Sequence, residues 1–186
     1  MMELSSEEKN ILLSAARKSI KSLFDITDIP IVNYKMTPSL KIKAGAFVTL
    51  KIKDELRGCI GYITSDRPLF ETVCEAAKQA AIKDPRFPPL TPKELNLTAI
   101  EISVLSPMKK ISNYSEIKIG EHGLLVEESY NRGLLLPQVA TENNYSLEQF
   151  LTSICMKAGL APDLWKRKKL NLQVFTALVF NEKGMS

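Results

Sequence analysis

The stretch Leu56-Arg57-Gly58-Cys59-Ile60-Gly61 decides how the rest of this 186-residue chain is interpreted. It follows a run, residues 46–53, in which apolar and polar residues alternate. Alternation with a period of two is typical of a strand with one buried face, and the tight connection at Asp54-Glu55 predicts a β-hairpin. Arg57 and Cys59 then point to the same side of the second strand. Two glycines within a strand usually mark a bulge, a sharp twist, or a place where another backbone or a ligand comes close.

This hexapeptide, called the signature below, also carries a family resemblance. It resembles the six-residue motif of the AMMECR domain family, which in prokaryotes is called AmmeMemoRadiSam system protein A. Three later stretches resemble the same family: Asp84 to Leu90, Glu121 to Leu124 and Gly133 to Ala140. The resemblance runs from about Gly45 to Phe180 and implies a two-lobed α+β architecture. It implies no established biochemical activity.

The resemblance also implies partners. Prokaryotic members of the family resemble companions of a Memo-type protein, itself similar to extradiol dioxygenases, and of a radical SAM protein. The chain departs from the family at Tyr145, where tryptophan is common, which weakens any role assigned to that ring.

Composition excludes several classes of protein. The 25 Lys and Arg residues against 21 Asp and Glu give a net charge of +4, too mild and too evenly spread to argue for nucleic-acid binding. Three scattered cysteines make no disulfide framework and favour a reducing cytoplasm. No apolar run approaches the roughly 18 residues of a membrane span, and no signal peptide is recognisable. One histidine argues against a zinc site, and no phosphate-binding glycine loop, dinucleotide fingerprint or serine nucleophile elbow is found. We therefore predict no metal and no cofactor.

The hydrophobic pattern predicts an order of elements that occurs twice. An amphipathic helix over residues 5–24 is expected to pack on a sheet, and an extended connection, residues 25–43, leads to the signature hairpin. The other expected elements are a helix capped by Asp66, a short turn capped by Thr91, a strand at 97–105, a hairpin of strands 123–127 and 132–139, a helix from Ser146 to Gly159, a short basic helix from Pro162, and a central strand at 172–180.

An internal duplication is indicated by matches at one offset. Arg57-Gly58 corresponds to Arg132-Gly133, and Leu95-Asn96-Leu97 corresponds to Leu170-Asn171-Leu172, both 75 residues apart. We therefore expect one AMMECR-like α+β domain over residues 1–186, with two lobes of antiparallel sheet and helices at approximately 44–106 and 107–180. Two such lobes would leave a cleft between them.

Cys59 is the first candidate for chemistry. Arg57 on the same strand face would favour a thiolate, and His122 could act as a base if the fold brings it near. The alternatives are structural. Cysteine is among the most buried residue types, and a small side chain suits a position between two glycines. An isolated histidine before a glycine is more often a turn residue with one hydrogen bond.

The other candidates are polar residues for ligand binding. Arg57, with Arg132 as its equivalent, could grip a carboxylate or phosphate, or could form an internal ion pair with Asp84 or Glu142. Four prolines stiffen the loop that presents Asp84 and Arg86. The remaining candidates are Gly58 and Gly61, where a ligand could approach the backbone, and Gln138 and Glu142, as polar walls of a cleft.

Two functional hypotheses follow. The first is a cytoplasmic enzyme or enzyme component that binds a small polar or anionic ligand between the lobes, with Memo-type and radical SAM proteins as partners. The second is a scaffold or protein-interaction module without catalysis. Nucleic-acid binding rests only on the mild basic charge and ranks last.

Overall fold

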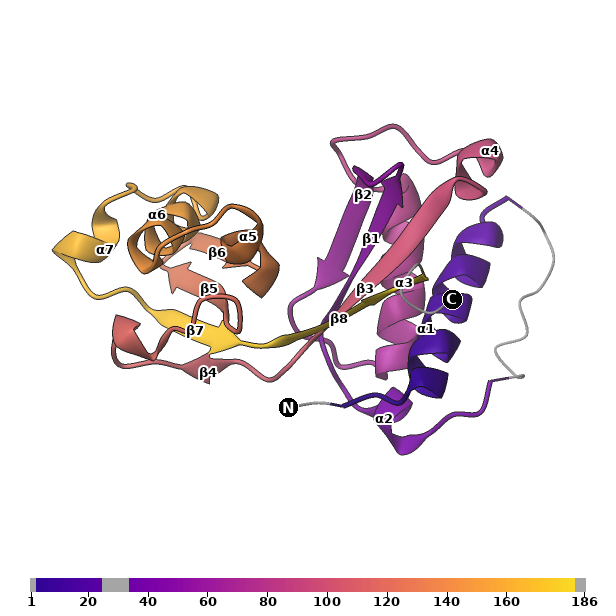
Figure 1. The fold of residues 1–186 in the computed structure, drawn as a ribbon, viewed down its shortest axis with the longest axis horizontal. Helices are drawn as coiled ribbons and strands as arrows, with labels where there is room; N and C mark the ends of the chain where they lie inside the picture. Colours follow the sequence, from indigo (N-terminus) through magenta and orange to yellow (C-terminus); the bar gives the residue numbers. More distant parts are fainter. Residues whose placement is uncertain (1–2, 25–33, 183–186) are drawn as a thin grey trace. The chain divides into compact units, whose positions relative to one another are not determined.

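The computed structural model describes residues 3–24 and 34–182, and the chain divides into two compact units (Figure 1). Of the described residues, the first unit comprises 3–24, 34–105 and 178–182, and the second comprises 106–177. Each unit holds a four-stranded antiparallel sheet with helices, which confirms the predicted α+β fold.

The first unit contains the signature on an edge strand. Its sheet has the order β2-β1-β3-β8. Its elements are α1 (Ser6–Lys21), α2 (Pro38–Lys41), β1 (Ala46–Ile52), β2 (Glu55–Tyr62), α3 (Leu69–Ile82), α4 (Pro92–Leu95), β3 (Thr98–Leu105) and β8 (Ala177–Asn181). The predicted hairpin is present as β1 and β2, and its two turn residues, Lys53 and Asp54, have φ values of 52° and 67°. Positive φ at both positions matches the twist of a two-residue hairpin turn.

Helix packing explains why the signature contains Gly58. Helix α3 lies against β1 and β2, and α1 packs on α3 and β3 (Figure 1). Leu12, Phe70 and Ile100 are fully buried in this core. A Cβ atom on Gly58 would overlap the carbonyl oxygen of Ala80 in α3. The helix can therefore approach β2 this closely only because position 58 has no side chain.

The second unit has a sheet of the same order. The order is β4-β7-β5-β6, so β6-β5-β7 corresponds to β2-β1-β3. Its elements are β4 (Lys109–Lys110), the 3-10 helix η2 (Tyr114–Glu116), β5 (Gly123–Glu128), β6 (Asn131–Leu135), α5 (Pro137–Glu142), α6 (Leu147–Lys157), α7 (Leu164–Arg167) and β7 (Leu172–Phe175). Helix α6 packs on β5 and β6, with Phe150 fully buried. Gly133 of β6 abuts Ala158 at the end of α6, as Gly58 abuts Ala80.

The fourth strand of the first sheet, β8, comes from the far end of the sequence, whereas β4 of the second sheet belongs to the same continuous segment as β5, β6 and β7. Strand β3 of the first sheet is followed in the chain by β4, which joins the second sheet, and β7 of the second sheet is followed by β8, which joins the first. Beyond β8, the carboxylate of Glu182 accepts two hydrogen bonds from Arg17 in α1, both 2.6 Å long, and one from the Ile100 N–H. Residues near the end of the chain thus complete the first unit.

Four predicted elements need correction. The last strand breaks at Thr176, so that β7 lies inside one sheet and β8 at the edge of the other. Pro137 begins α5 instead of continuing β6, because a missing N–H costs nothing in the first turn of a helix. Helix α3 begins after Pro68 and has no side-chain cap from Asp66. Pro38–Lys41 is a helical turn, and residues 25–33 of the predicted connection lie outside the described residues.

No helix among the described residues is long and apolar enough to cross a membrane. Within residues 3–24 and 34–182, His, Cys, Asp and Glu side chains form no group of three that could hold a metal ion.

Substituting Gly58 by Ala should destabilise the protein by about 3 kcal/mol, because the new methyl group must displace backbone of α3. The matched variant is Gly133→Ala, whose Cβ would lie 2.9 Å from the Cβ of Ala158 and needs a smaller shift. We expect a lower urea midpoint for both variants and a clearly larger loss for Gly58→Ala. Equal losses would contradict this account of the signature glycine.

Candidate functional site

Arg57 of the signature forms an internal ion pair. Its Nε and Nη2 donate to the two carboxylate oxygens of Glu94 in α4, at 2.9 and 3.2 Å, and Nη2 also reaches the Pro89 carbonyl at 3.4 Å. The Arg57 side chain is only 12% exposed. The guanidinium, together with hydrogen bonds from Thr91, lowers the pKa of Glu94 to about 2. Arg57 therefore fastens the edge strand to α4, and its partner is neither Asp84 nor Glu142.

Asp84 and Arg86 form a second pair beside the same strand. The buried Asp84 carboxylate accepts the Cys59 backbone N–H at 2.8 Å. It also accepts the Nε and Nη2 of Arg86, at 3.0 and 2.7 Å, and the Arg86 backbone N–H at 3.1 Å. These hydrogen bonds, with Arg86 the largest influence, hold the pKa of Asp84 far below its usual range. These hydrogen bonds offset the free-energy cost of burying the Asp84 charge.

The ring of Phe87 joins the two pairs into one cluster. The guanidinium carbons of Arg57 and Arg86 lie 5.8 and 5.6 Å from the ring centroid, within the range of cation–π attraction. We call Arg57, Asp84, Arg86, Phe87 and Glu94 the arginine cluster. The structure thus brings three predicted site residues together, with every carboxylate paired to a guanidinium.

Cys59 has the environment of a neutral thiol. Thr49 on the neighbouring strand donates a hydrogen bond to its sulfur, 3.3 Å away. Burial raises the pKa of the Cys59 thiol, and this effect outweighs the opposing influences of the Thr49 hydrogen bond and the Arg86 charge. A thiol with a raised pKa holds little of the nucleophilic thiolate near neutral pH.

His122 belongs to the second unit, whereas Cys59 belongs to the first. Its Nδ1 accepts the Lys118 backbone N–H at 3.2 Å, and its own backbone N–H donates to the Lys118 carbonyl at 2.9 Å. A neutral ring that accepts at Nδ1 carries its proton on Nε2 and has no free basic nitrogen. This is the geometry of a turn residue.

The remaining predicted residues serve local packing or lie on the surface of the second unit. A Cβ on Gly61 would meet the Ala46 carbonyl and the Phe47 ring, so protein groups fill the space at this glycine. Arg132 pairs with Glu127 across the hairpin at 2.9 Å. On α5, Glu142 is exposed, whereas the side-chain oxygen of Gln138 is buried without a hydrogen-bond partner among the described residues.

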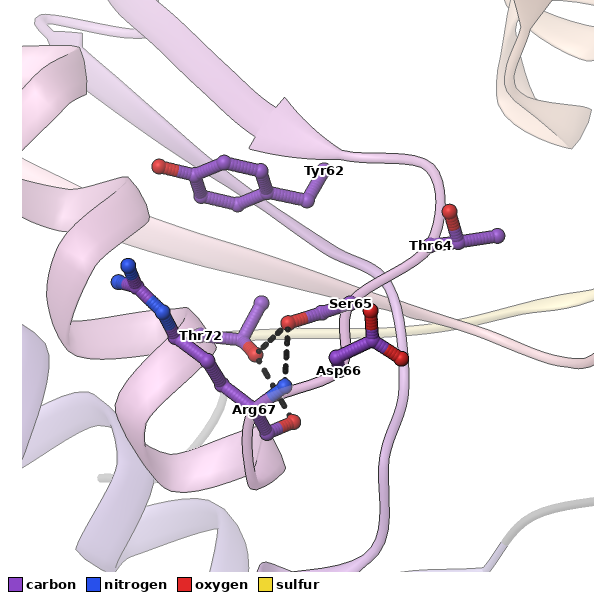
Figure 2. Close-up of a pocket in the computed structure, with 6 residues that line it drawn as sticks. All are labelled: Tyr62, Thr64, Ser65, Asp66, Arg67 and Thr72. Carbon is purple, nitrogen blue, oxygen red and sulfur yellow. Dashed lines mark hydrogen bonds between the residues drawn. The ribbon is translucent and has the colours of Figure 1, made fainter.

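A pocket opens at the far end of the signature strand, where sequence analysis placed no site. Its volume is about 260 Å³, and its lining consists of Tyr62, Thr64, Ser65, Asp66, Arg67 and Thr72 (Figure 2). The hydroxyl of Thr72, a residue only 1% exposed, lies 2.8 Å from the Ser65 hydroxyl, which also accepts the Arg67 backbone N–H at 3.1 Å. These bonds fix the loop that follows β2.

Arg67 differs from the other arginines of the chain. The ion pairs of the other five are Arg17–Glu182, Arg57–Glu94, Arg86–Asp84, Arg132–Glu127 and Arg167–Asp163. The guanidinium of Arg67 has no ion pair or hydrogen bond with any residue that the structure describes, and the same holds for the carboxylate of Asp66. The pocket therefore presents one cationic and one anionic group that pair with no residue in the described ranges, 3–24 and 34–182.

Sequence analysis missed this site because nothing local distinguishes Arg67 from its paired counterparts. Its neighbours Asp66 and Pro68 resembled the start of a helix, which directed attention to capping. Only the folded structure shows which charges find partners.

Comparisons with known proteins agree on one family. The AMMECR1 family model matches residues 13–180. A protein from Sulfolobus acidocaldarius is 44% identical over 182 residues, covering 92% of this chain and 80% of that protein. One from Methanothermobacter thermautotrophicus is 42% identical and covers 97% of each. The crystal structure of the uncharacterized protein PH0010 from Pyrococcus horikoshii matches with a TM-score of 0.84 at 39% identity, over 92% of this chain and 90% of that one.

Alkylation of the native protein should be slow at Cys59. Because burial raises the pKa of this thiol, the rate with iodoacetamide should keep rising above pH 8.5 and show no plateau at neutral pH. Peptide mass spectrometry after timed quenching measures the rate at each cysteine, and urea-unfolded protein provides the reference. A fast reaction with a midpoint below pH 8 would restore Cys59 as a nucleophile.

Because of the ion pair of Glu94, the free energy of unfolding should decrease as the pH falls into the acidic range. The folded pKa of about 2 lies below the ordinary value, so the stabilising effect is complete above about pH 5 and is lost as pH falls toward 2. Glu94→Gln keeps the acceptor for Thr91 but removes the charge. We expect it to cost about 1 kcal/mol at pH 7 and almost nothing near pH 2, measured by urea unfolding.

The control for this experiment is Glu148→Gln, which removes a mostly exposed carboxylate 3.6 Å from Lys166. It should change stability little at either pH. A cost of Glu94→Gln that persists unchanged at pH 2 would contradict the proposed role of the charge.

Proposed function

The chain belongs to the AMMECR1 family, and from that premise we propose that it binds a small anionic ligand without itself supplying a nucleophile or a base. The observation that carries the proposal is the guanidinium of Arg67, which lines a polar pocket and has no partner among the described residues (Figure 2). The other arginines of the chain, by contrast, are used in ion pairs.

The chemistry of the pocket suits a carboxylate or phosphate. A guanidinium presents a planar fork of donors that matches either group. Thr64 and Ser65, which carry short hydroxyl side chains, also line the pocket. Hydrogen bonds to charged groups contribute about 1.5–3 kcal/mol each, enough for a weak but measurable complex with a small ion.

The state of the catalytic candidates also favours binding. Cys59 has a raised pKa and accepts a hydrogen bond from Thr49, and the Nδ1 of His122 is occupied by the Lys118 N–H. Neither side chain is prepared for nucleophilic or base catalysis. Residues for chemistry, if the ligand is transformed, would then come from another protein.

The wider setting is part of the same proposal. We propose that the protein works in the cytoplasm beside a Memo-type protein and a radical SAM protein, with this chain as the component that holds a ligand. Family membership and the absence of cofactor motifs in the sequence support this role. The site proposed here lies within the first unit, and a ligand cleft between the lobes stays a prediction.

A second candidate function is a protein-interaction module. Tyr130, at the tip of the β5–β6 hairpin, is completely exposed, and Met156 on α6 is 62% exposed. Large apolar side chains at such positions are common in binding surfaces. The two functions are compatible, because Tyr130 and Met156 belong to the second unit and the pocket belongs to the first.

Arg67→Gln should weaken anion binding about tenfold or more without changing the thermal midpoint, since this side chain has no described partner to lose. Binding of inorganic phosphate and of benzoate, followed by NMR shifts of backbone amides at residues 62–72, measures the effect at constant ionic strength.

The matched control is Arg167→Gln, which removes an equal charge from a helix in the second unit. It should bind like the wild type. The proposal is overturned if Arg67→Gln binds both ions as the wild type does, or if neither ion shifts these amides in the wild type.

A further inference from the structure

The arrangement of groups around the pocket restricts the ligand further than its charge does. Figure 2 shows the aromatic ring of Tyr62 above the hydroxyls of Ser65 and Thr72, with the Arg67 guanidinium toward one end and the Asp66 carboxylate toward the other. We propose that the ligand is a flat aromatic or heteroaromatic acid that carries a hydrogen-bond donor, such as an amino group, away from its acidic group. This inference rests on the proposed function of the same pocket.

The aromatic ring of Tyr62, one of the residues that line the pocket, favours a flat ligand. Tyr62 is the last residue of β2, and it is 36% exposed. Tyrosine rings stack on other aromatic rings or cover apolar faces while the hydroxyl stays in water. The floor opposite the ring is held in place by the bond between Ser65 and Thr72. A slot with one aromatic wall and a fixed floor favours a planar molecule.

The carboxylate of Asp66 favours a ligand that carries a hydrogen-bond donor. Its carboxylate lines the same pocket as Arg67, and neither group pairs with the other or with another described residue. A ligand with only negative charge would meet repulsion from Asp66. A ligand that places its acid at Arg67 and an N–H at Asp66 satisfies both groups at once. The two separate charges therefore favour a ligand with an acidic group at one end and a hydrogen-bond donor at the other.

The volume sets the size of the ligand. A space of about 260 Å³ holds a single ring with its substituents and lies near the lower end of the range for small-molecule sites. A long polymer or a large cofactor does not fit within this space, although part of a larger molecule could extend into solvent.

The test uses a series of small acids whose members differ by one feature each. Acetate and cyclohexanecarboxylate carry the acid without a flat ring, benzoate adds the ring, and the three aminobenzoate isomers add a donor at three different distances. Dissociation constants come from NMR shifts of the amides of residues 62–72. We expect benzoate to bind about fivefold more tightly than cyclohexanecarboxylate, and one aminobenzoate isomer about fivefold more tightly again.

Two variants assign these gains to their residues. Tyr62→Leu keeps an apolar side chain but removes the ring, and it should abolish the preference for benzoate over cyclohexanecarboxylate. Asp66→Asn keeps the size of the side chain but removes its charge, and it should abolish the preference for the best aminobenzoate over benzoate. Asp66 is exposed and Tyr62 is 36% exposed, so neither variant removes a buried core side chain, and the amide spectrum checks that both fold.

The outcomes separate this inference from the proposed function. If all acids bind equally and all binding depends on Arg67, the anion site stands and the proposal of a flat aromatic acid with a hydrogen-bond donor is wrong. If no acid depends on Arg67, both proposals are wrong. If the preferences are present in the wild type but survive Tyr62→Leu and Asp66→Asn, the ligand class has been assigned to the wrong residues and the inference is overturned.

Discussion

The Asp84 carboxylate is the group on which the signature region depends. It accepts the outward backbone N–H of Cys59 on edge strand β2 and, through the two Arg86 side-chain nitrogens, fixes the stiff proline loop against that strand. The Leu90 N–H then returns to the Ala81 carbonyl of α3. Removing the carboxylate would take away the acceptor of the Cys59 N–H and the partner of the Arg86 guanidinium, whose side chain is 54% exposed and can turn to water. One buried anion therefore joins strand, loop and helix.

This arrangement changes how the polar residues of the signature are interpreted. Arginine and cysteine side by side on a strand resemble a reactive site in the sequence, but in the folded chain Arg57 neutralises Glu94 and Cys59 is a hydrogen-bonded thiol. The residues that remain available for a ligand follow the signature, at Tyr62 to Arg67. The part of β2 around Arg57 and Cys59 is thus held by the ion pairs, whereas its last residue, Tyr62, and the loop that follows line the pocket.

Local patterns could be predicted from the sequence, and distant pairings could not. The cap predicted at Thr91 is such a local pattern, and it is present as a capping box with Glu94, three residues away. Strand alternation likewise located both hairpins. The partner of Arg57 could not be found in this way, because Glu94 lies 37 residues away and several other carboxylates were equally plausible. That Arg67 pairs with none of the described residues was further out of reach, since it depends on where all their charges lie. Proline 137 was misplaced because one residue type suits both strand edges and helix starts.

The late position of β8 in the sequence has a consequence for how the protein is made. The first sheet lacks β8 until residues 177–181 have left the ribosome, and Arg17 has no carboxylate partner until Glu182 follows. About four-fifths of the chain must therefore be translated between α1 and the residues that complete its packing, at about 5–20 residues per second. During this delay the outer edge of β3 is open to other strands. A nascent chain that stops short of β8 would keep this edge unpaired, and an unpaired edge is a template for aggregation.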